Sequence, residues 1–155
     1  MAISILKRRT RPRVVRDVLT RLAAGILWCV LAAYAQAAQL QQHTVSSDNH
    51  PIAVWEKSPA NPVGAIVLIH GRTWSALPDF DLQVDGEELS LMDGLVDEGY
   101  QVYAIDLRGY GATPRDDSGW NTPDKAAHDT RAVLEWIIET TGARPAVLGW
   151  SNGSL

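Results

Sequence analysis

Residues 145–155 read PAVLGWSNGSL, a short apolar run that gives way to small residues around a serine. The apolar run predicts a strand, and the pattern G-x-S-x-G predicts a tight turn from that strand into a helix. Glycine at Gly149 and Gly153 would let strand and helix approach closely, with strained backbone at Ser151 between them. This arrangement is a nucleophile elbow, so Ser151 is the first candidate catalytic residue.

Length and charge limit the classes of partner. The chain has 155 residues, 46% of them hydrophobic and 21% charged, which suits one modest globular domain. Seven of the 14 basic residues precede residue 22, so seven remain beyond it. Only one of the 18 acidic residues, Asp17, lies in that first part, so 17 remain and the formal balance of the rest is −10. We therefore expect no nucleic-acid partner.

The N-terminal segment has the order of a secretory signal. A basic block is followed by the apolar run 22–35 and by small residues up to Ala38. We expect residues 1–37 to form a signal peptide, cleaved after Ala35 or Ala37. The alternative is that the segment is retained as a membrane anchor, and only in that case do we expect the membrane as a partner. The single cysteine, Cys29, lies inside this segment, so the body can form no disulfide. An exported bacterial protein, periplasmic or secreted, fits this pattern.

Beyond the signal, apolar runs alternate with helical patterns. The expected elements are a hairpin of strands at 40–46 and 52–55, buried strands at 64–69, 101–105 and 145–148, and helices at 86–98 and 123–140. The second helix is expected to bury Ala127, Ala132, Val133, Trp136 and Ile137. This order predicts an α/β fold with a doubly wound sheet over residues 38–155, in which the loops after the three buried strands meet at one edge.

Those three loops carry a family resemblance. His70 and Gly71 follow the first buried strand, DLRGYG at 106–111 follows the second, and GWSNG at 149–153 follows the third. Over about residues 44–155 the chain resembles the N-terminal portion of the α/β-hydrolase superfamily. The resemblance implies an acyl-enzyme formed on Ser151 from a small-molecule ester or acyl compound, with no metal or organic cofactor.

The resemblance also implies where developing negative charge is stabilised. The family's oxyanion hole uses the backbone amide after the nucleophile, here that of Asn152, and an amide after the His-Gly pair. That second donor is Arg72, or Thr73 if the loop is shifted by one residue. We expect the Arg72 side chain to be solvated or to contact Asp79 or Asp81; the alternative is a role in substrate binding.

Other residues near the site have structural and functional interpretations. We expect His70 and Asp106 to fix their loops, as Gly71, Gly149 and Gly153 do, rather than to act on substrate. Trp74 and Trp150 either line an acyl pocket or pack in the core. His128, in the middle of the second helix, is expected to be partly exposed.

The chain also departs from the family. The family's acid and histidine follow the serine in chain order, and both would lie beyond Leu155. Three explanations stand open: a fragment of a longer hydrolase, a shortened gene product, or a chain completed by a second chain. The expected function is that of an exported serine hydrolase, esterase-like, in its full-length form, with the 155-residue chain inactive. The alternative is a non-catalytic binding protein of the same fold or an inactive truncated product; esterase, lipase, thioesterase and peptidase chemistry remain open.

Overall fold

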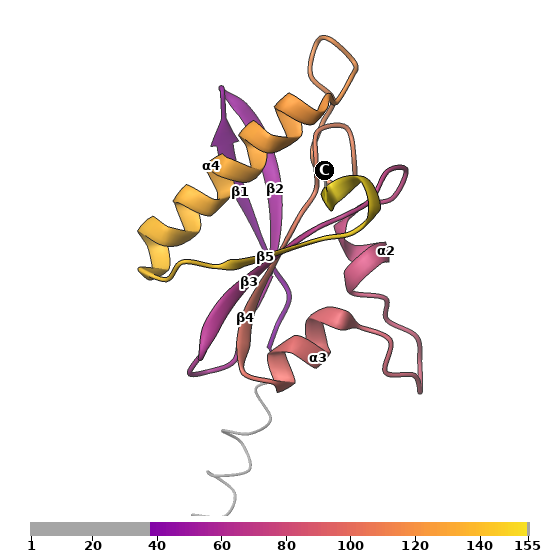
Figure 1. Ribbon diagram of the computed structural model, residues 1–155. Helices are drawn as coiled ribbons and strands as arrows, with labels where there is room; N and C mark the ends of the chain where they lie inside the picture. Colours follow the sequence, from indigo (N-terminus) through magenta and orange to yellow (C-terminus); the bar gives the residue numbers. More distant parts are fainter. Residues whose placement is uncertain (1–37, 155) are drawn as a thin grey trace, which may run out of the picture. The chain divides into compact units, whose positions relative to one another are not determined.

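The computed structural model describes residues 38–154 (Figure 1). The predicted signal peptide or anchor at 1–37 lies outside the described residues. The elements in chain order are β1 (Gln41–Ser47), β2 (His50–Lys57), β3 (Gly64–Ile69), α2 (Ala76–Phe80), α3 (Leu91–Asp97), β4 (Tyr100–Ile105), α4 (Pro123–Thr141), β5 (Ala146–Gly149) and the 3-10 helix η1 (Ser151–Ser154).

The five strands form one mixed sheet in the order β1-β2-β4-β3-β5. β3 pairs in parallel with both β4 and β5, and the carboxyl ends of the three are level because Ile69 is opposite Ile105 and Gly149. β1 and β2 form the predicted hairpin and join the sheet antiparallel to β4. Asp48 and Asn49, with φ of 50° and 62°, make its two-residue turn, as short polar residues readily do. The parallel core with crossover helices confirms the predicted α/β fold.

Alternate side chains of the central strands enter two separate cores. On one face Val67 and Tyr103 pack with Val133 of α4. On the other face Leu68 and Ala104 pack in a core that includes residues of α2 and α3. Figure 1 shows α4 on one side of the sheet and the two short helices on the other. Because both faces are covered, β3 and β4 are apolar almost throughout, as the sequence indicates.

α4 begins and ends as predicted. The Thr122 side chain accepts a hydrogen bond from the Lys125 amide at 3.3 Å, and Gly142 ends the helix with a φ of 72°. Val133 and Ile137 are buried. The expectation for Ala127 was wrong, since it is exposed. Four residues before Val133, the same face carries a buried Asp129 instead.

The region between β3 and β4 differs from the prediction. Residues 76–80, expected in a loop, form the short helix α2, and the helix expected from residue 86 begins only at Leu91. Ser90 sets that start because its side chain accepts a hydrogen bond from the Asp93 amide at 2.9 Å. The residues before it, 82–89, are exposed.

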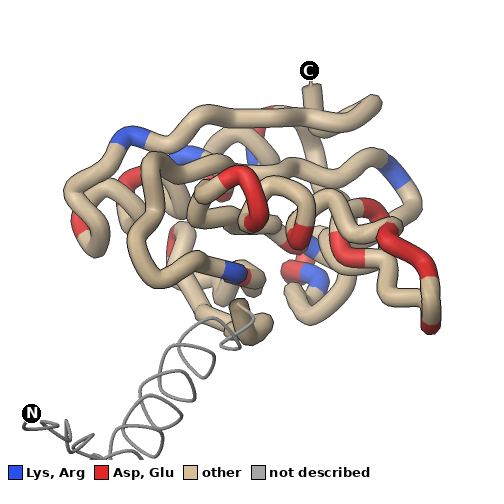
Figure 2. The backbone as a smooth tube through the Cα atoms, turned by 90° about the horizontal axis from the view of Figure 1, so that it is seen from below, with Lys and Arg blue, Asp and Glu red and all other residues tan. Residues whose placement is uncertain are grey.

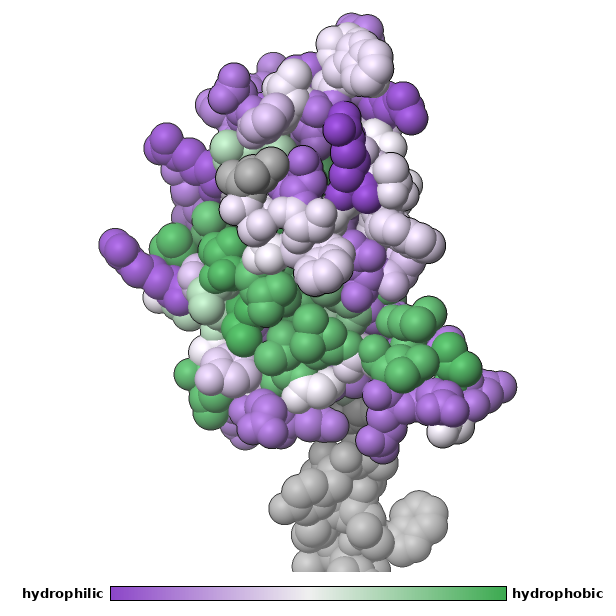
Figure 3. Space-filling view, turned by 45° about the vertical axis from the view of Figure 1, so that its right-hand side comes forward, coloured by the Kyte–Doolittle hydropathy of each residue, from purple (hydrophilic) through white to green (hydrophobic). Residues whose placement is uncertain are grey.

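The strand that the sequence predicts to be buried at 145–148 is exposed in the structure. β5 lies at the sheet edge beside β3, and Val147 and Leu148 are 51% and 40% exposed. Within the described part of the chain, the apolar side chains of β5 are therefore exposed at the edge of the sheet. Figure 3 shows hydrophobic residues gathered on one part of the surface, below a mainly polar upper part.

Acidic positions outnumber basic ones along the described backbone (Figure 2). Within residues 38–154 no helix is both long enough and apolar enough to cross a membrane. The apolar segment 22–38, predicted to belong to a signal peptide or a membrane anchor, lies outside that range except for Ala38.

Candidate active site

The strand-to-turn junction at Ser151 has the strained geometry of an elbow. Ser151 has a φ of 52° and is exposed at the start of η1, directly after β5 and Trp150. A Cβ at Gly149 would collide with the backbone of Gly153, and one at Gly153 would collide with the carbonyl oxygen of Ile69. The two glycines therefore let the turn fold back over the end of β3, as the G-x-S-x-G pattern predicts.

The elbow is packed against the loop that follows β3. The Trp150 amide donates a 3.0 Å hydrogen bond to the Ile69 carbonyl oxygen. A Cβ at Gly71 would lie only 3.0 Å from Cδ1 of Trp150 and 3.2 Å from Cβ of Ser151. Gly71 thus allows its loop to approach the candidate nucleophile to within van der Waals contact.

Three backbone amides near the elbow have no partner within residues 38–154. They belong to Asn152 and Arg72, the two predicted oxyanion donors, and to Thr73, the alternative to Arg72, whereas the Gly71 amide donates to Asp79 Oδ2 at 3.2 Å. Thr73 has a φ of 75°, which is unusual for a β-branched residue and marks local strain. The donor role itself remains a prediction.

His70 is completely buried and holds two loops together. Its Nε2 accepts a hydrogen bond of 3.0 Å from the Leu107 amide, which places the ring proton on Nδ1. Nδ1 then donates to the Gly71 carbonyl oxygen at 2.7 Å, and Tyr110 packs edge-on at 5.0 Å between ring centres. Both ring nitrogens are occupied, so His70 has the geometry of a loop support.

Asp106 is also buried and satisfies donors from three segments. Its carboxylate accepts hydrogen bonds from Trp55 Nε1 at 2.8 Å, from the Ala76 amide at 2.8 Å and from the Ala112 amide at 2.9 Å. A Cβ at Gly111 would collide with this carboxylate. Asp106 therefore ties β2 and α2 to the turn after β4.

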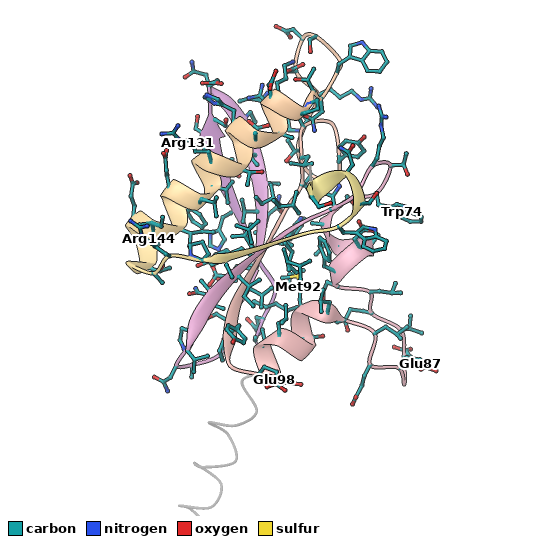
Figure 4. All side chains as sticks on the ribbon, in the orientation of Figure 1. Trp74, Glu87, Met92, Glu98, Arg131 and Arg144 are labelled. Atoms are coloured by element: carbon teal, nitrogen blue, oxygen red, sulfur yellow. The ribbon has the colours of Figure 1, made fainter. Side chains whose placement is uncertain are left out.

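A cavity of about 600 Å³ opens beside the elbow. Its walls come from the loops after β3 and β4, from the segment before α4, and from Asn152. Trp74 and Trp150, which are 60% and 62% exposed, are not among the lining residues, and the core-packing interpretation of both was wrong. Figure 4 shows the Trp74 side chain pointing away from the sheet. Their role in an acyl pocket stays a prediction.

The Arg72 side chain is exposed and borders the cavity. The expected contact with Asp79 or Asp81 is absent within residues 38–154, because Asp79 accepts from the Gly71 amide and Asp81 pairs with Lys57 at 2.6 Å. Neither acid therefore forms an ion pair with Arg72 in the described part of the chain.

The chain's four histidines all lie in the described part, and none of them forms a hydrogen bond with Ser151. His43 pairs with Glu56 on the hairpin, and the exposed His128 lies 3.3 Å from Asp48. No group of three or more potential metal-ligating side chains occurs within residues 38–154.

The sequence patterns and this geometry agree with the comparison to known families. A model of the alpha/beta hydrolase family matches residues 66–155. The chain belongs to the alpha/beta hydrolase family. The predicted family resemblance and fold class are therefore confirmed. No curated protein sequence matches this alpha/beta hydrolase.

Solved structures share the fold. An esterase of Pyrococcus furiosus has a TM-score of 0.58 and 20% identity, covering 76% of this chain and 44% of its own. A protein of Thermoplasma acidophilum described as a predicted CIB-like hydrolase has a TM-score of 0.55 and 21% identity, covering 75% of this chain and 53% of its own. A membrane phospholipase A, described as a bacterial virulence factor, has a TM-score of 0.53 and 26% identity, covering 91% and 41%. The chain spans about half or less of the length of each.

One charged cluster near the cavity was not predicted. Arg108 donates two hydrogen bonds to Asp129, from Nε at 2.7 Å and from Nη2 at 2.8 Å, and lies 3.2 Å from Asp116. The hydrogen bond to Asp129 raises the pKa of Arg108 despite its burial. The available signal was the four-residue spacing of Asp129, Val133 and Ile137, which puts the acid on the buried face of α4.

Proposed function

We propose that the full-length protein is an exported serine hydrolase that cleaves small-molecule esters through an acyl-enzyme on Ser151, and that the 155-residue chain is an incomplete, inactive part of it. The observation that carries this proposal is the exposed Ser151 with its φ of 52°, held by two glycines that can accept no Cβ. Strained backbone of this kind persists where the surrounding structure requires it, commonly at functional sites. The esterase and the phospholipase A among the structural neighbours support ester chemistry.

In the proposed reaction the Ser151 hydroxyl loses its proton to a base as its oxygen attacks the ester carbonyl carbon. The carbonyl oxygen becomes an oxyanion that the amides of Asn152 and Arg72, or Thr73, stabilise. Collapse expels the alcohol, which takes up the proton, and leaves an ester on Ser151. Water then attacks that ester, releasing the carboxylic acid and restoring the hydroxyl. Each amide donor would contribute about 3 kcal/mol to transition-state stabilisation.

The base must come from outside the described arrangement. His70 uses both ring nitrogens in the loop contact, and none of the other three histidines forms a hydrogen bond with Ser151. We therefore place the base and its orienting acid on sequence beyond Leu155 or on a second chain. The same observation favours the second candidate, a non-catalytic binding protein of this fold.

The test is labelling by a serine-reactive fluorophosphonate probe. A chain extended past Leu155 through a later acid and histidine should label strongly, and its Ser151→Ala variant should not. The 155-residue chain should label weakly, because its serine has no base. Equal labelling of the extended chain and its Ser151→Ala variant would remove Ser151 as the nucleophile, and rapid ester turnover by the 155-residue chain would overturn the incomplete-site proposal.

Export is tested separately. A signal peptide at 1–37 predicts a product in the periplasm or medium whose N-terminus is near Gln36 or Ala38. Retention of an uncleaved chain in membranes after a high-salt wash would instead support the anchor.

A further inference from the structure

Positive charge gathers in the cavity beside the elbow. Arg72, Arg108 and Arg115 line it, and Asp116 is the one acidic residue among the described lining residues. These are three of the seven basic residues beyond residue 21, in a part of the chain that holds 17 acidic residues. A concentration of cations in an acidic body points to a local purpose, because charged clefts focus the field on their ligands.

The charges of Arg108 and Asp116 are already compensated. Arg108 is paired bidentately with the buried Asp129. Asp116 lies 3.2 Å from Arg108 and 2.5 Å from Lys125 Nζ, and the hydrogen bond from Lys125 holds the pKa of Asp116 well below its usual range. Among the described lining residues the cavity therefore has no carboxylate without a cationic partner.

Arg115 is held at the cavity by the turn beneath it. The Gly109 amide donates to the Pro114 carbonyl oxygen at 3.0 Å, and a Cβ at Gly109 would lie only 2.9 Å from Cγ of Arg115. With a φ of 81°, Gly109 has the backbone conformation and the space that let the Arg115 stem cross it. Within residues 38–154 Arg115 has no acidic partner.

Arg72 stands at the other side of the same cavity, next to the candidate nucleophile. It follows Gly71, whose missing Cβ would lie 3.2 Å from Cβ of Ser151. Within the described residues its guanidinium also has no acidic partner. Two arginines without an acidic partner among the described residues thus line one cavity that reaches Asn152 of the elbow.

We propose that the acyl compound bound at the Ser151 site carries an anionic group, a carboxylate or a phosphate, which Arg72 and Arg115 bind. This substrate class rests on the proposed function. Planar guanidinium groups match both anions through paired, charge-assisted hydrogen bonds. The volume of about 600 Å³ suits a small molecule, and Trp120, which is 74% exposed at the rim, offers an apolar surface for the rest of it.

The test measures binding rather than turnover. The chain carrying Ser151→Ala is titrated calorimetrically, at low ionic strength, with N-benzoylglycine and with its neutral amide, N-benzoylglycinamide. We expect the acid to bind about tenfold more tightly, the effect of roughly one charge-assisted hydrogen bond. Benzyl phosphate forms the second arm, and whichever anion binds more tightly identifies the preferred group.

Matched variants locate the effect. Arg72→Gln and Arg115→Gln should each reduce the preference for the acid, and together they should abolish it. Arg144→Gln removes the same charge from an exposed position beyond α4, outside the cavity lining and far from Trp74 in Figure 4, and should leave the preference unchanged. Circular dichroism verifies that each variant is folded.

Equal binding of the acid and the amide, or an equal loss of preference in Arg144→Gln, would overturn the proposal. Failure of the fluorophosphonate probe to label Ser151 in the chain extended past Leu155 would instead contradict the hydrolase mechanism. Because the binding test uses Ser151→Ala, the two failures are distinguishable.

Discussion

The Leu107 amide donates a 3.0 Å hydrogen bond to Nε2 of His70, so a buried side chain joins the loops after β4 and β3. The neighbouring hydrogen bond from Nδ1 to the Gly71 carbonyl oxygen fixes the loop that borders Ser151. A histidine next to a candidate nucleophile invites a role in proton transfer. Here both ring nitrogens are hydrogen-bonded within the fold, so we expect His70 to position the loop.

His70 variants should test the hydrogen bond between the Leu107 amide and the His70 ring. His70→Leu leaves the buried Leu107 amide without an acceptor, so we expect a loss of about 2 kcal/mol in the free energy of unfolding. His70→Gln can still present an oxygen to that amide and should lose less. Urea unfolding followed by tryptophan fluorescence measures both, and a larger loss in His70→Gln than in His70→Leu would contradict the hydrogen-bond assignment.

The elbow glycines should tolerate no side chain. Gly153→Ala puts a Cβ against the Ile69 and His70 carbonyl oxygens, and Gly149→Ala puts one against Gly153. Both changes should displace Ser151 and increase amide hydrogen exchange at the end of β3. Gly94→Ala is the matched control, because Gly94 lies within α3 with open space around it. Gly94→Ala should gain about 0.5–1 kcal/mol in the free energy of unfolding and leave hydrogen exchange at the end of β3 unchanged. An equal increase in hydrogen exchange there in all three variants would contradict the steric requirement at Gly149 and Gly153.

Asp106→Asn should loosen the turn after β4. The carboxylate accepts three hydrogen bonds, and an amide in either orientation presents its NH₂ group to at least one of those donors. We expect a loss of about 2 kcal/mol in the free energy of unfolding, together with a changed environment of Trp55. Asp117→Asn, at an exposed position of the next loop, is the control and should have little effect. A fully stable Asp106→Asn would show that these hydrogen bonds contribute no net stability.

Local signals in the sequence predicted the parts of the fold that depend on neighbouring residues. Thr122 and Gly142 bound α4 because capping depends on a few consecutive residues, and the glycines around Ser151 are required by backbone contacts within the elbow and with the end of β3. The pairing of Arg108 with Asp129 could not be predicted this way, because it joins a loop to a helix 21 residues later. The exposure of Val147 depends on which elements cover the sheet edge, and its own sequence does not contain that information.

Lys57 forms a buried ionic network on the face of the sheet opposite α4. Its Nζ lies 2.6 Å from a carboxylate oxygen of both Asp81 and Asp93, and Gln83 and Ser90 donate to the same acids. Burial lowers the pKa of Lys57, but the hydrogen bonds to the two acids outweigh it and raise the pKa above 10.5. Burial raises the pKa of Asp93, but the hydrogen bonds from Lys57 and Gln83 outweigh it and hold the pKa below 3.8.

The network should make stability depend on pH in a defined window. The lowered pKa of Asp93 contributes stability that is present above pH 3.8 and is lost as the pH falls through the folded-state value. The raised pKa of Lys57 contributes stability that is present below pH 10.5 and is lost as the pH rises through its folded-state value.

Lys57→Met should cost about 3 kcal/mol near neutral pH, because it leaves the buried Asp81 carboxylate without its cation. The difference from the wild type should narrow in acid, where the wild type loses the stability that the lowered pKa of Asp93 contributes. Thermal unfolding across the pH range measures this, and Arg131→Met is the control because its pair with Glu135 is exposed and should contribute little at any pH. A difference between Lys57→Met and the wild type that stays constant from neutral pH into acid would show that the lysine acts by packing its stem rather than by its charge.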